Sequence, residues 1–265
     1  MRQGRHSARR KGIGKNIVLV IMIAVFLGGL VYALYPIITG LTLMHETRTV
    51  SENFFRTLPA NLSSYPEAPS TDDRIDSGSD EVSADTPYPE LLAAMQAYND
   101  RIYAEGQSGL VDAWSYEAPS FDLTEYGIED DVIGVLSISS INLQMPIYLG
   151  ATYSHMAAGA AHLSQTSLPI GGVNTNCVIA GHRGWSGAPY FLNMDKVEVG
   201  DTVTITNLWE TLTYRVCETR VIEPNDIDAV LIQPGRDMLT LITCHPYASG
   251  GRYRLVVYCE RTQNS

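Results

Sequence analysis

The sequence is poor in cysteine and in basic residues, and both shortages exclude whole classes of protein. The chain of 265 residues contains four cysteines, and its 18 lysine and arginine residues stand against 29 acidic ones, for a net charge of -11. Four cysteines are too few for a dense disulfide scaffold, and no C-x-x-C pair indicates a zinc knuckle or a thioredoxin-like site. The acidic balance argues against a general nucleic-acid binder. Since 45% of the residues are hydrophobic, a wholly disordered chain is excluded as well.

Charge is absent from one long stretch near the N-terminus. Residues 16–44 contain no charged side chain, and about 20 apolar helical residues suffice to cross a bilayer. Residues 1–15 carry six basic side chains and no acidic one, so the positive-inside rule predicts a cytoplasmic tail there. We therefore expect a single transmembrane helix over 16–39 that anchors the protein in the cell membrane, with an extracellular body after it. A cleaved signal peptide is the alternative, and it also places the body outside the cytoplasm.

Two segments of different character separate this anchor from the rest. Within 40–88, residues 45–62 are typical of a short helix that leaves the membrane. Residues 63–90 then hold eight acidic residues against the single Arg74, with many serines and prolines. Such a composition buries too little apolar area to order itself, which predicts a disordered linker. Apolar residues at helical spacing open the next segment, 89–131, so we expect a helix followed by an irregular, aromatic stretch.

Short β-patterns with turn signals between them fill residues 132–265. One helical stretch is expected around 153–163. The candidate strands are 132–138, 145–150, 176–181, 202–207, 211–222, 238–244 and 252–260. Seven short strands in a segment of this length are typical of an all-β sandwich or barrel.

One cysteine has the setting that thiol chemistry needs. Cys244 ends an apolar strand, TLITC, and a turn follows at once. A nucleophilic thiol must be ionised, and an adjacent histidine or cation is the usual means of activating it. The other three cysteines are more typical of small buried apolar residues: Cys177, Cys217 and Cys259.

A histidine and an arginine have matching positions at strand ends. His182 closes the apolar run CVIAGH, although a histidine taken at random is more often structural than catalytic. Gly181 and Gly184 flank it, and we expect them to leave space for a ligand. Arg252 and Arg254 share one face of the last strand, because alternate residues point the same way. A guanidinium is always charged and suits the stabilisation of an oxyanion.

Three motifs in this order resemble the sortase family. They are TLITC (240–244), the later RLVVYCER (254–261) and the earlier GHRG (181–184). The longer stretches 159–184 and 231–247 are similar to class C, pilin-type sortases, as is the layout of an anchor, a helix and an extra segment before the barrel.

The resemblance implies an eight-stranded β-barrel with short helices and a cysteine transpeptidase activity. Cys244 matches the family's nucleophile, His182 its acid/base and Arg254 its oxyanion or substrate contact. Arg254 is preferred to Arg252 because it directly precedes the Leu-Val-Val strand. The implied substrates are surface or pilin proteins with an LPXTG-like sorting signal. The acyl group would pass through a thioester to an amine, either a pilin lysine in pilus assembly or a cell-wall peptide in housekeeping anchoring.

Class C sortases also carry a lid with an Asp-Pro-aromatic motif before the barrel. The matching place here reads Asp112-Ala113-Trp114. The resemblance implies that Asp112 pairs with the catalytic arginine and that Trp114 covers the thiol. The middle proline is absent, and the alternative is that Trp114 only packs among neighbouring aromatic residues.

Several questions stay open at the level of sequence. Cys217 and Cys259 are candidates for a disulfide, but nothing in the pattern decides it. His245 stands beside Cys244, and strand geometry ranks it below His182 as the base because it would point away from the thiol. No metal-ligand cluster and no phosphate-binding loop appears, so no cofactor is expected. A hydrolytic cysteine peptidase and a non-catalytic, membrane-tethered β-domain that binds surface proteins remain the alternative functions.

Overall fold

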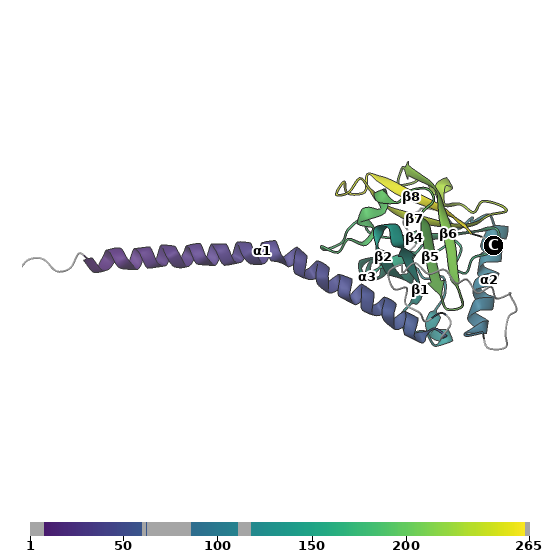
Figure 1. The fold of residues 1–265 in the computed structure, drawn as a ribbon, viewed down its shortest axis with the longest axis horizontal. Helices are drawn as coiled ribbons and strands as arrows, with labels where there is room; N and C mark the ends of the chain where they lie inside the picture. The colour runs from purple at the N-terminus through teal and green to yellow at the C-terminus, as the bar shows by residue number, and fades with distance from the viewer. Residues whose placement is uncertain (1–7, 60–61, 63–85, 111–117, 263–265) are drawn as a thin grey trace, which may run out of the picture.

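The computed structural model describes residues 8–59, 62, 86–110 and 118–262. Its centre is a closed β-barrel, as the sequence and its resemblance predict (Figure 1). Around the barrel the strand order is β1-β2-β3-β4-β7-β8-β6-β5, and β5 pairs with β1 to close it. The strands are β1 (Val132–Ile138), β2 (Leu143–Leu149), β3 (Ala160–His162), β4 (Thr175–Ala180), β5 (Thr202–Asn207), β6 (Thr211–Ile222), β7 (Asp237–His245) and β8 (Tyr253–Arg261).

Strands β4, β7 and β8 are buried on both faces over most of their length. Their alternate side chains enter two different apolar clusters. Cys177 and Ile179 of β4 belong to the cluster that fills the barrel, whereas Val178 and Ala180 belong to a second, outer cluster. Near-continuous apolar runs are what two-sided burial demands. The outer cluster includes Val230, which belongs to a short 3-10 helix over the sheet.

The sequence pattern misses one strand. Residues 153–163 were expected to be helical, but helix α3 (Tyr153–Ala158) ends at Gly159, whose backbone is extended with φ -175° and ψ -150°. The next three residues form β3, which pairs in parallel with β2 and antiparallel with β4. Three residues are too few for a period-2 pattern to be recognised, so this part of the prediction was wrong.

Helix α1 runs without interruption from Ala8 to Thr57. The separate helix expected over 45–62 is therefore the continuation of the apolar one. Figure 1 shows a bend near the middle of α1, and Pro36 lies inside the helix, where proline removes a backbone donor and kinks the chain. Within the described residues, α1 is the one helix long and apolar enough to cross a membrane.

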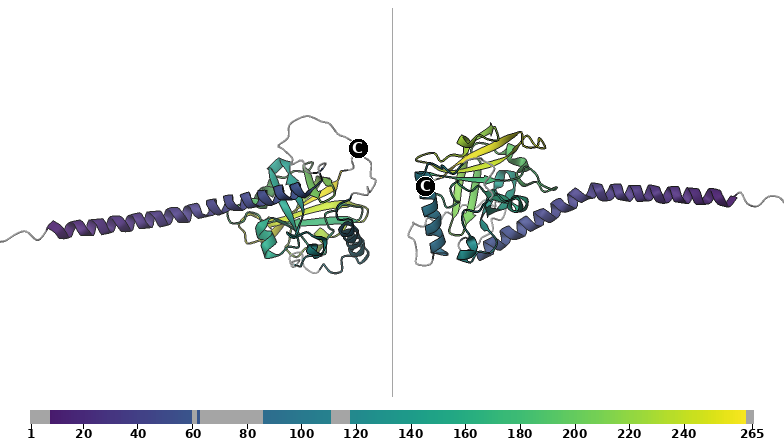
Figure 2. Two further views of the ribbon diagram at one scale, coloured as in Figure 1. Left: turned by 90° about the horizontal axis from the view of Figure 1, so that it is seen from below. Right: turned by 180° about the vertical axis from the view of Figure 1, so that it is seen from behind.

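The two halves of α1 have different surroundings. Apolar side chains from Ile17 to Leu41 are exposed, as expected of a helix that faces lipid. The second half lies along the barrel (Figure 2) and buries Ser51, Phe54 and Phe55 against it. The predicted amphipathic helix α2 (Pro89–Ala104) likewise buries its apolar side chains on the domain.

The structure also answers the question about the disulfide. All four cysteines are free. The register between β6 and β8 shifts between Val216 and Glu218, so Cys217 bulges outward and is exposed. Cys259 points into the barrel core and is fully buried. The two thiols therefore lie on opposite faces of the sheet.

Candidate active site

The parallel pairing of β4 with β7 brings two predicted site residues to the same edge of the barrel. Ala180 is the register partner of Ile242, two residues before His182 and Cys244 respectively. Beyond the paired residues, the Gly181 N–H donates to the carbonyl of Ile242 at 3.2 Å, and the Thr243 hydroxyl donates to the Gly181 carbonyl at 2.7 Å. These bonds hold the ends of the two strands together, so His182 and Cys244 follow at the same level.

The neighbouring strand adds the arginine. Cys244 and Arg254 are direct cross-strand partners in the antiparallel β7–β8 pair. The Sγ of Cys244 and the Nη1 of Arg254 lie 3.4 and 2.9 Å from one point, the position that a Cβ on Gly251 would take. Gly251 has φ +80°, a conformation that favours glycine, and the missing side chain leaves that point open. The Arg254 Nη1 also donates to the carbonyls of Gly251 and Tyr253, which orients the guanidinium.

An indole covers one face of the His182 ring. The ring of Trp185 stacks on it with centroids 4.4 Å apart and an interplanar angle of 9°. Burial lowers the pKa of His182 from its ordinary value of 6.5, because a less polar surrounding disfavours the charged imidazolium. The backbone carbonyl of His182 accepts bonds from the N–H groups of Gly184 and Phe191 at 2.9 and 3.0 Å. The residue is therefore held by its neighbours, and it stays partly exposed.

The expectation that glycines beside His182 leave room for a ligand was wrong for Gly181. A Cβ at Gly181 would lie 2.7 Å from the ring of Phe191, so the residue is small because this buried aromatic ring packs against it. At Gly184 a Cβ would lie 3.3 Å from the Tyr247 ring. Both glycines serve close packing of the edge.

A second contact joins the two strand ends, and it had not been predicted. Arg183 follows His182, and His245 follows Cys244. The Nη1 of Arg183 lies 2.8 Å from the Nδ1 of His245, and its Nη2 lies 2.8 Å from the Oδ2 of Asp195. A guanidinium only donates, so the Nδ1 of His245 is the acceptor and carries no proton. His245 thus points to Arg183, consistent with its lower rank as a base. The sequence places each of them directly after a candidate site residue, but only the parallel register of β4 and β7 brings the two together.

The remaining described ring and thiol groups of the barrel have structural surroundings. His162 is fully buried, its Nε2 donates to the Ser167 carbonyl at 3.0 Å, and burial lowers its pKa to about 4. His155 stacks on Tyr148, and its Nδ1 lies 2.9 Å from the Gly150 carbonyl. Burial also raises the pKa of the thiols at Cys177 and Cys259. These residues suit packing better than chemistry.

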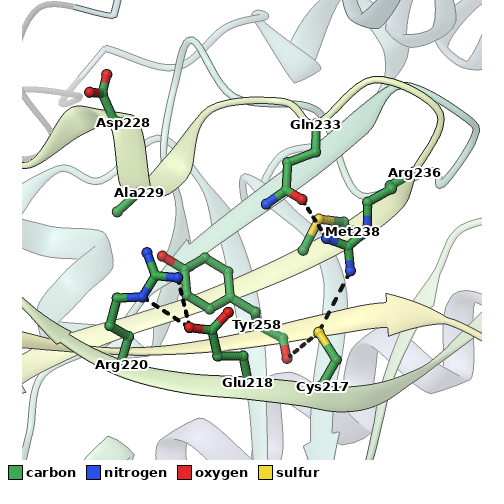
Figure 3. Close-up of a pocket in the computed structure, with 9 residues that line it drawn as sticks. All are labelled: Cys217, Glu218, Arg220, Asp228, Ala229, Gln233, Arg236, Met238 and Tyr258. Carbon is green, nitrogen blue, oxygen red and sulfur yellow. Dashed lines mark hydrogen bonds and ion pairs between the residues drawn. The ribbon is translucent and has the colours of Figure 1, made fainter.

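Asp112 and Trp114, the residues of the expected lid, lie outside the described residues. A pocket elsewhere on the barrel is described, and Figure 3 shows its lining. The exposed thiol of Cys217 donates to the Tyr258 carbonyl at 3.3 Å and lies 3.9 Å from the Arg236 Nη2. Tyr258 is four residues further along β8 than Arg254, so this pocket is separate from the edge that carries Cys244.

A closed β-barrel with a half-buried thiol opposite a guanidinium, and a histidine on the adjoining strand end, defines a thiol-dependent acyl-transfer enzyme class. The sortase domain model matches residues 136–262. Sortase C1 of pilus island 1 from group B Streptococcus is 31% identical, with a TM-score of 0.61, over 68% of this chain and 92% of that one. Sortase C-1 from Actinomyces oris is 34% identical, with a TM-score of 0.56, over 66% of this chain and 99% of that one.

A curated relative, Sortase D from Bacillus subtilis, is 26% identical over 130 residues, which is 48% of this chain. That match spans 63% of the length of Sortase D. The chain belongs to the sortase family, whose members are cysteine transpeptidases.

Proposed function

We propose that this protein is a membrane-anchored cysteine transpeptidase that cleaves an LPXTG-like sorting signal and transfers the acyl group to an amine. The observation that carries the proposal is the cross-strand pair of Cys244 and Arg254 at the barrel edge where His182 also lies. A nucleophile, an acid/base and a fixed cation within one edge are the three parts that acyl transfer requires.

The reaction follows from these three groups. The thiolate of Cys244 attacks the carbonyl carbon of the threonine in the signal, and the carbonyl electrons move to the oxygen. The Arg254 guanidinium stabilises the resulting oxyanion. His182, as the imidazolium, gives a proton to the departing glycine nitrogen, and a thioester remains. An incoming amine then attacks the thioester, His182 takes up its proton, and the thiolate leaves as the new amide forms.

We further propose that the acceptor is a pilin lysine. The chain is 31% identical, with a TM-score of 0.61, to sortases that are described as pilus-related, and this likeness supports the proposal. The second acceptor to test is the amine of a cell-wall peptide, to which surface proteins would be attached, because the same thioester can react with either amine.

We assign the anchor to α1 and the catalytic domain to the extracellular side. The uncharged run of residues 16–44 follows six basic residues, which supports a cytoplasmic N-terminus. Figure 1 gives the geometric support, since the exposed half of α1 leaves the barrel on one side while the other half lies against it.

The test is the intact mass of the full chain in detergent micelles with a panel of LPXTG-like peptides. We expect a mass gain equal to the peptide's N-terminal fragment, and Cys244→Ala should lose it. Cys217→Ser is the matched control, because Cys217 is an exposed thiol in a separate pocket, and it should keep the adduct. Loss of the nucleophile should lower the rate by about 10⁴-fold or more.

Further arms separate the alternatives. An adduct that appears only in the Asp112→Ala/Trp114→Ala double variant would support a lid over the thiol. Products with a pilin lysine peptide, with a cell-wall peptide or with water alone distinguish pilus assembly, housekeeping anchoring and hydrolysis. If no folded variant forms an adduct with any peptide, the proposal fails in favour of a binding domain.

A further inference from the structure

Helix α1 touches the loop that follows His182. The turn Trp185–Ala188 is closed by two backbone bonds between its end residues, at 2.9 and 2.8 Å. Inside this turn, Gly187 lies against the bent middle of α1. A Cβ on Gly40 would lie 2.4 Å from the backbone of Gly187, and a Cβ on Gly187 would lie 1.9 Å from the Pro36 carbonyl oxygen. Such close approach of two backbones requires glycine on both sides.

A hydrogen bond accompanies this contact. The Thr39 hydroxyl donates toward the Ser186 carbonyl at 3.0 Å, and it shares its single proton with two carbonyls of its own helix. Ser186 has φ 45°, a left-handed conformation that costs a residue other than glycine some energy. The contact with α1 therefore holds the turn in a shape that it would not prefer alone.

The register of α1 on the barrel is fixed further along the helix. Thr47 donates to the Ala158 carbonyl at 3.2 Å, and Tyr190 donates to the adjacent Ala157 carbonyl at 2.7 Å. Tyr190 follows the His182 loop directly and is buried. The loop after His182 is thus bonded to α1 through Ser186, and the residue that follows it, Tyr190, is bonded to α3.

The turn leads to the imidazole through Trp185. This residue begins the turn. Its ring stacks on His182, and the ring of Tyr153 packs against it edge to face at a centroid distance of 5.9 Å. A displacement of the turn would move the indole, and the indole covers one face of the imidazole. The chain of contacts runs from Gly40 and Thr39 through the turn to the acid/base.

We propose that Gly40 and Thr39 of the anchor helix are positioning residues for His182. The helix does more than attach the domain, because its bent middle sets the place of the histidine loop. The consequence for catalysis rests on the role given to His182 in the proposed function, but the structural part does not.

The experiment uses the full chain in detergent micelles, labelled at histidine for NMR. A stacked indole moves the ring protons of His182 upfield, and His182→Gln identifies the resonance. Gly40→Leu should remove this upfield shift and lower kcat for the adduct-forming LPXTG-like peptide by roughly 10- to 100-fold, with little change in KM, because an ångström of misplacement is that costly. Thr39→Val should lower kcat by about threefold, the size of one hydrogen bond.

Two matched controls lie in the same helix. At Gly28 a Cβ would meet nothing within 4 Å, so Gly28→Leu should leave the His182 resonance and kcat unchanged. Among the residues that the structure describes, the Thr42 hydroxyl bonds only to the Ile38 carbonyl of its own helix, so Thr42→Val tests loss of a hydroxyl without loss of the loop contact.

The outcomes are separable from those of the proposed function. A lost upfield shift in Gly40→Leu but not in Gly28→Leu supports the inference even if no peptide is cleaved. Equal His182 resonances in these two variants would overturn it. If Gly40→Leu does not fold, Thr39→Val decides: a His182 resonance identical to that of Thr42→Val would reject the positioning role.

Discussion

The two ends of strands β4, β7 and β8 are built from the same sheet and have opposite characters. At one end the Asp237 carboxylate accepts from the Gly172 N–H at 2.9 Å, and from the hydroxyls of Thr175 and Tyr214, both at 3.3 Å. Arg261 lies over the Tyr214 ring there at 5.6 Å. At the other end the same strands bring Cys244 beside Arg254, with an open point between them.

We infer that the first end serves stability and that the second serves the proposed chemistry. We call the Asp237 end closed because its carboxylate already accepts hydrogen bonds from Gly172, Thr175 and Tyr214. The Cys244 end leaves a half-buried thiol and a glycine where a side chain would obstruct it. Both ends belong to the same buried strands, so variants at the two ends can be compared directly.

The sharpest test of this contrast replaces one arginine at each end by lysine. Arg254→Lys removes the planar fork of donors beside Cys244, and we expect kcat for sorting-peptide transfer to fall by about 10²-fold. Arg261→Lys keeps the charge but weakens the ion pair with Glu210, which is 3.3 Å long, and the cation–π contact with Tyr214. It should cost about 1 kcal/mol of unfolding free energy and leave kcat unchanged.

Steady-state kinetics and urea unfolding of both variants make the comparison. If Arg261→Lys lowers kcat as much as Arg254→Lys does, the two ends are not functionally distinct. If Arg254→Lys keeps full activity, its guanidinium is not the group that stabilises the oxyanion.

The Cys244 end, which we call the open end, shows which features of the site can be predicted from local sequence. The apolar runs before Cys244 and His182 predict strands, and each residue directly follows its run, so both positions at a barrel edge are readable without a structure. The fold class and the long apolar helix follow from the same kind of pattern. The expectation of eight strands in a closed barrel came from the resemblance, because the three residues of β3 are too few to form a recognisable pattern.

Long-range contacts lie beyond that reading. Gly181 is small because the ring of Phe191 packs against it. The contact of Gly40 with Gly187 joins residues far apart in sequence. No local period encodes such pairs, since they depend on how separate elements meet in three dimensions.

The bridge between Arg183 and His245 provides a finer test of the open end. His245→Leu removes the acceptor and leaves a buried guanidinium with one partner fewer, which should lower kcat by about tenfold through a looser edge. His245→Asn offers a side-chain oxygen at the same reach and should restore most of the rate. Comparable losses in both variants would mean that the imidazole itself is required. An unchanged rate in His245→Leu would show that the contact between Arg183 and His245 does not position the site.

The smallest expected effect concerns the closed end and depends on pH. Burial raises the pKa of Asp237 above its ordinary value of 3.8, against the lowering effects of the Gly172 N–H and Arg261. The folded state then binds this proton more tightly than the unfolded state. The stability contributed by Asp237 is therefore greatest at low pH and is lost as pH rises through the folded pKa.

We expect the thermal midpoint of the native chain, relative to Asp237→Asn, to fall as pH is raised from about 3 to 7. Asp122 is the control of opposite sign. Bonds from the Thr124 hydroxyl and N–H lower its pKa, so its stability contribution is lost as pH falls, and the difference between the native chain and Asp122→Asn should change in the other direction. If both differences follow pH with the same sign, the carboxylate at the closed end is not held in a desolvated place. Only the Cys244 end would then have the special character that the comparison assigns to it.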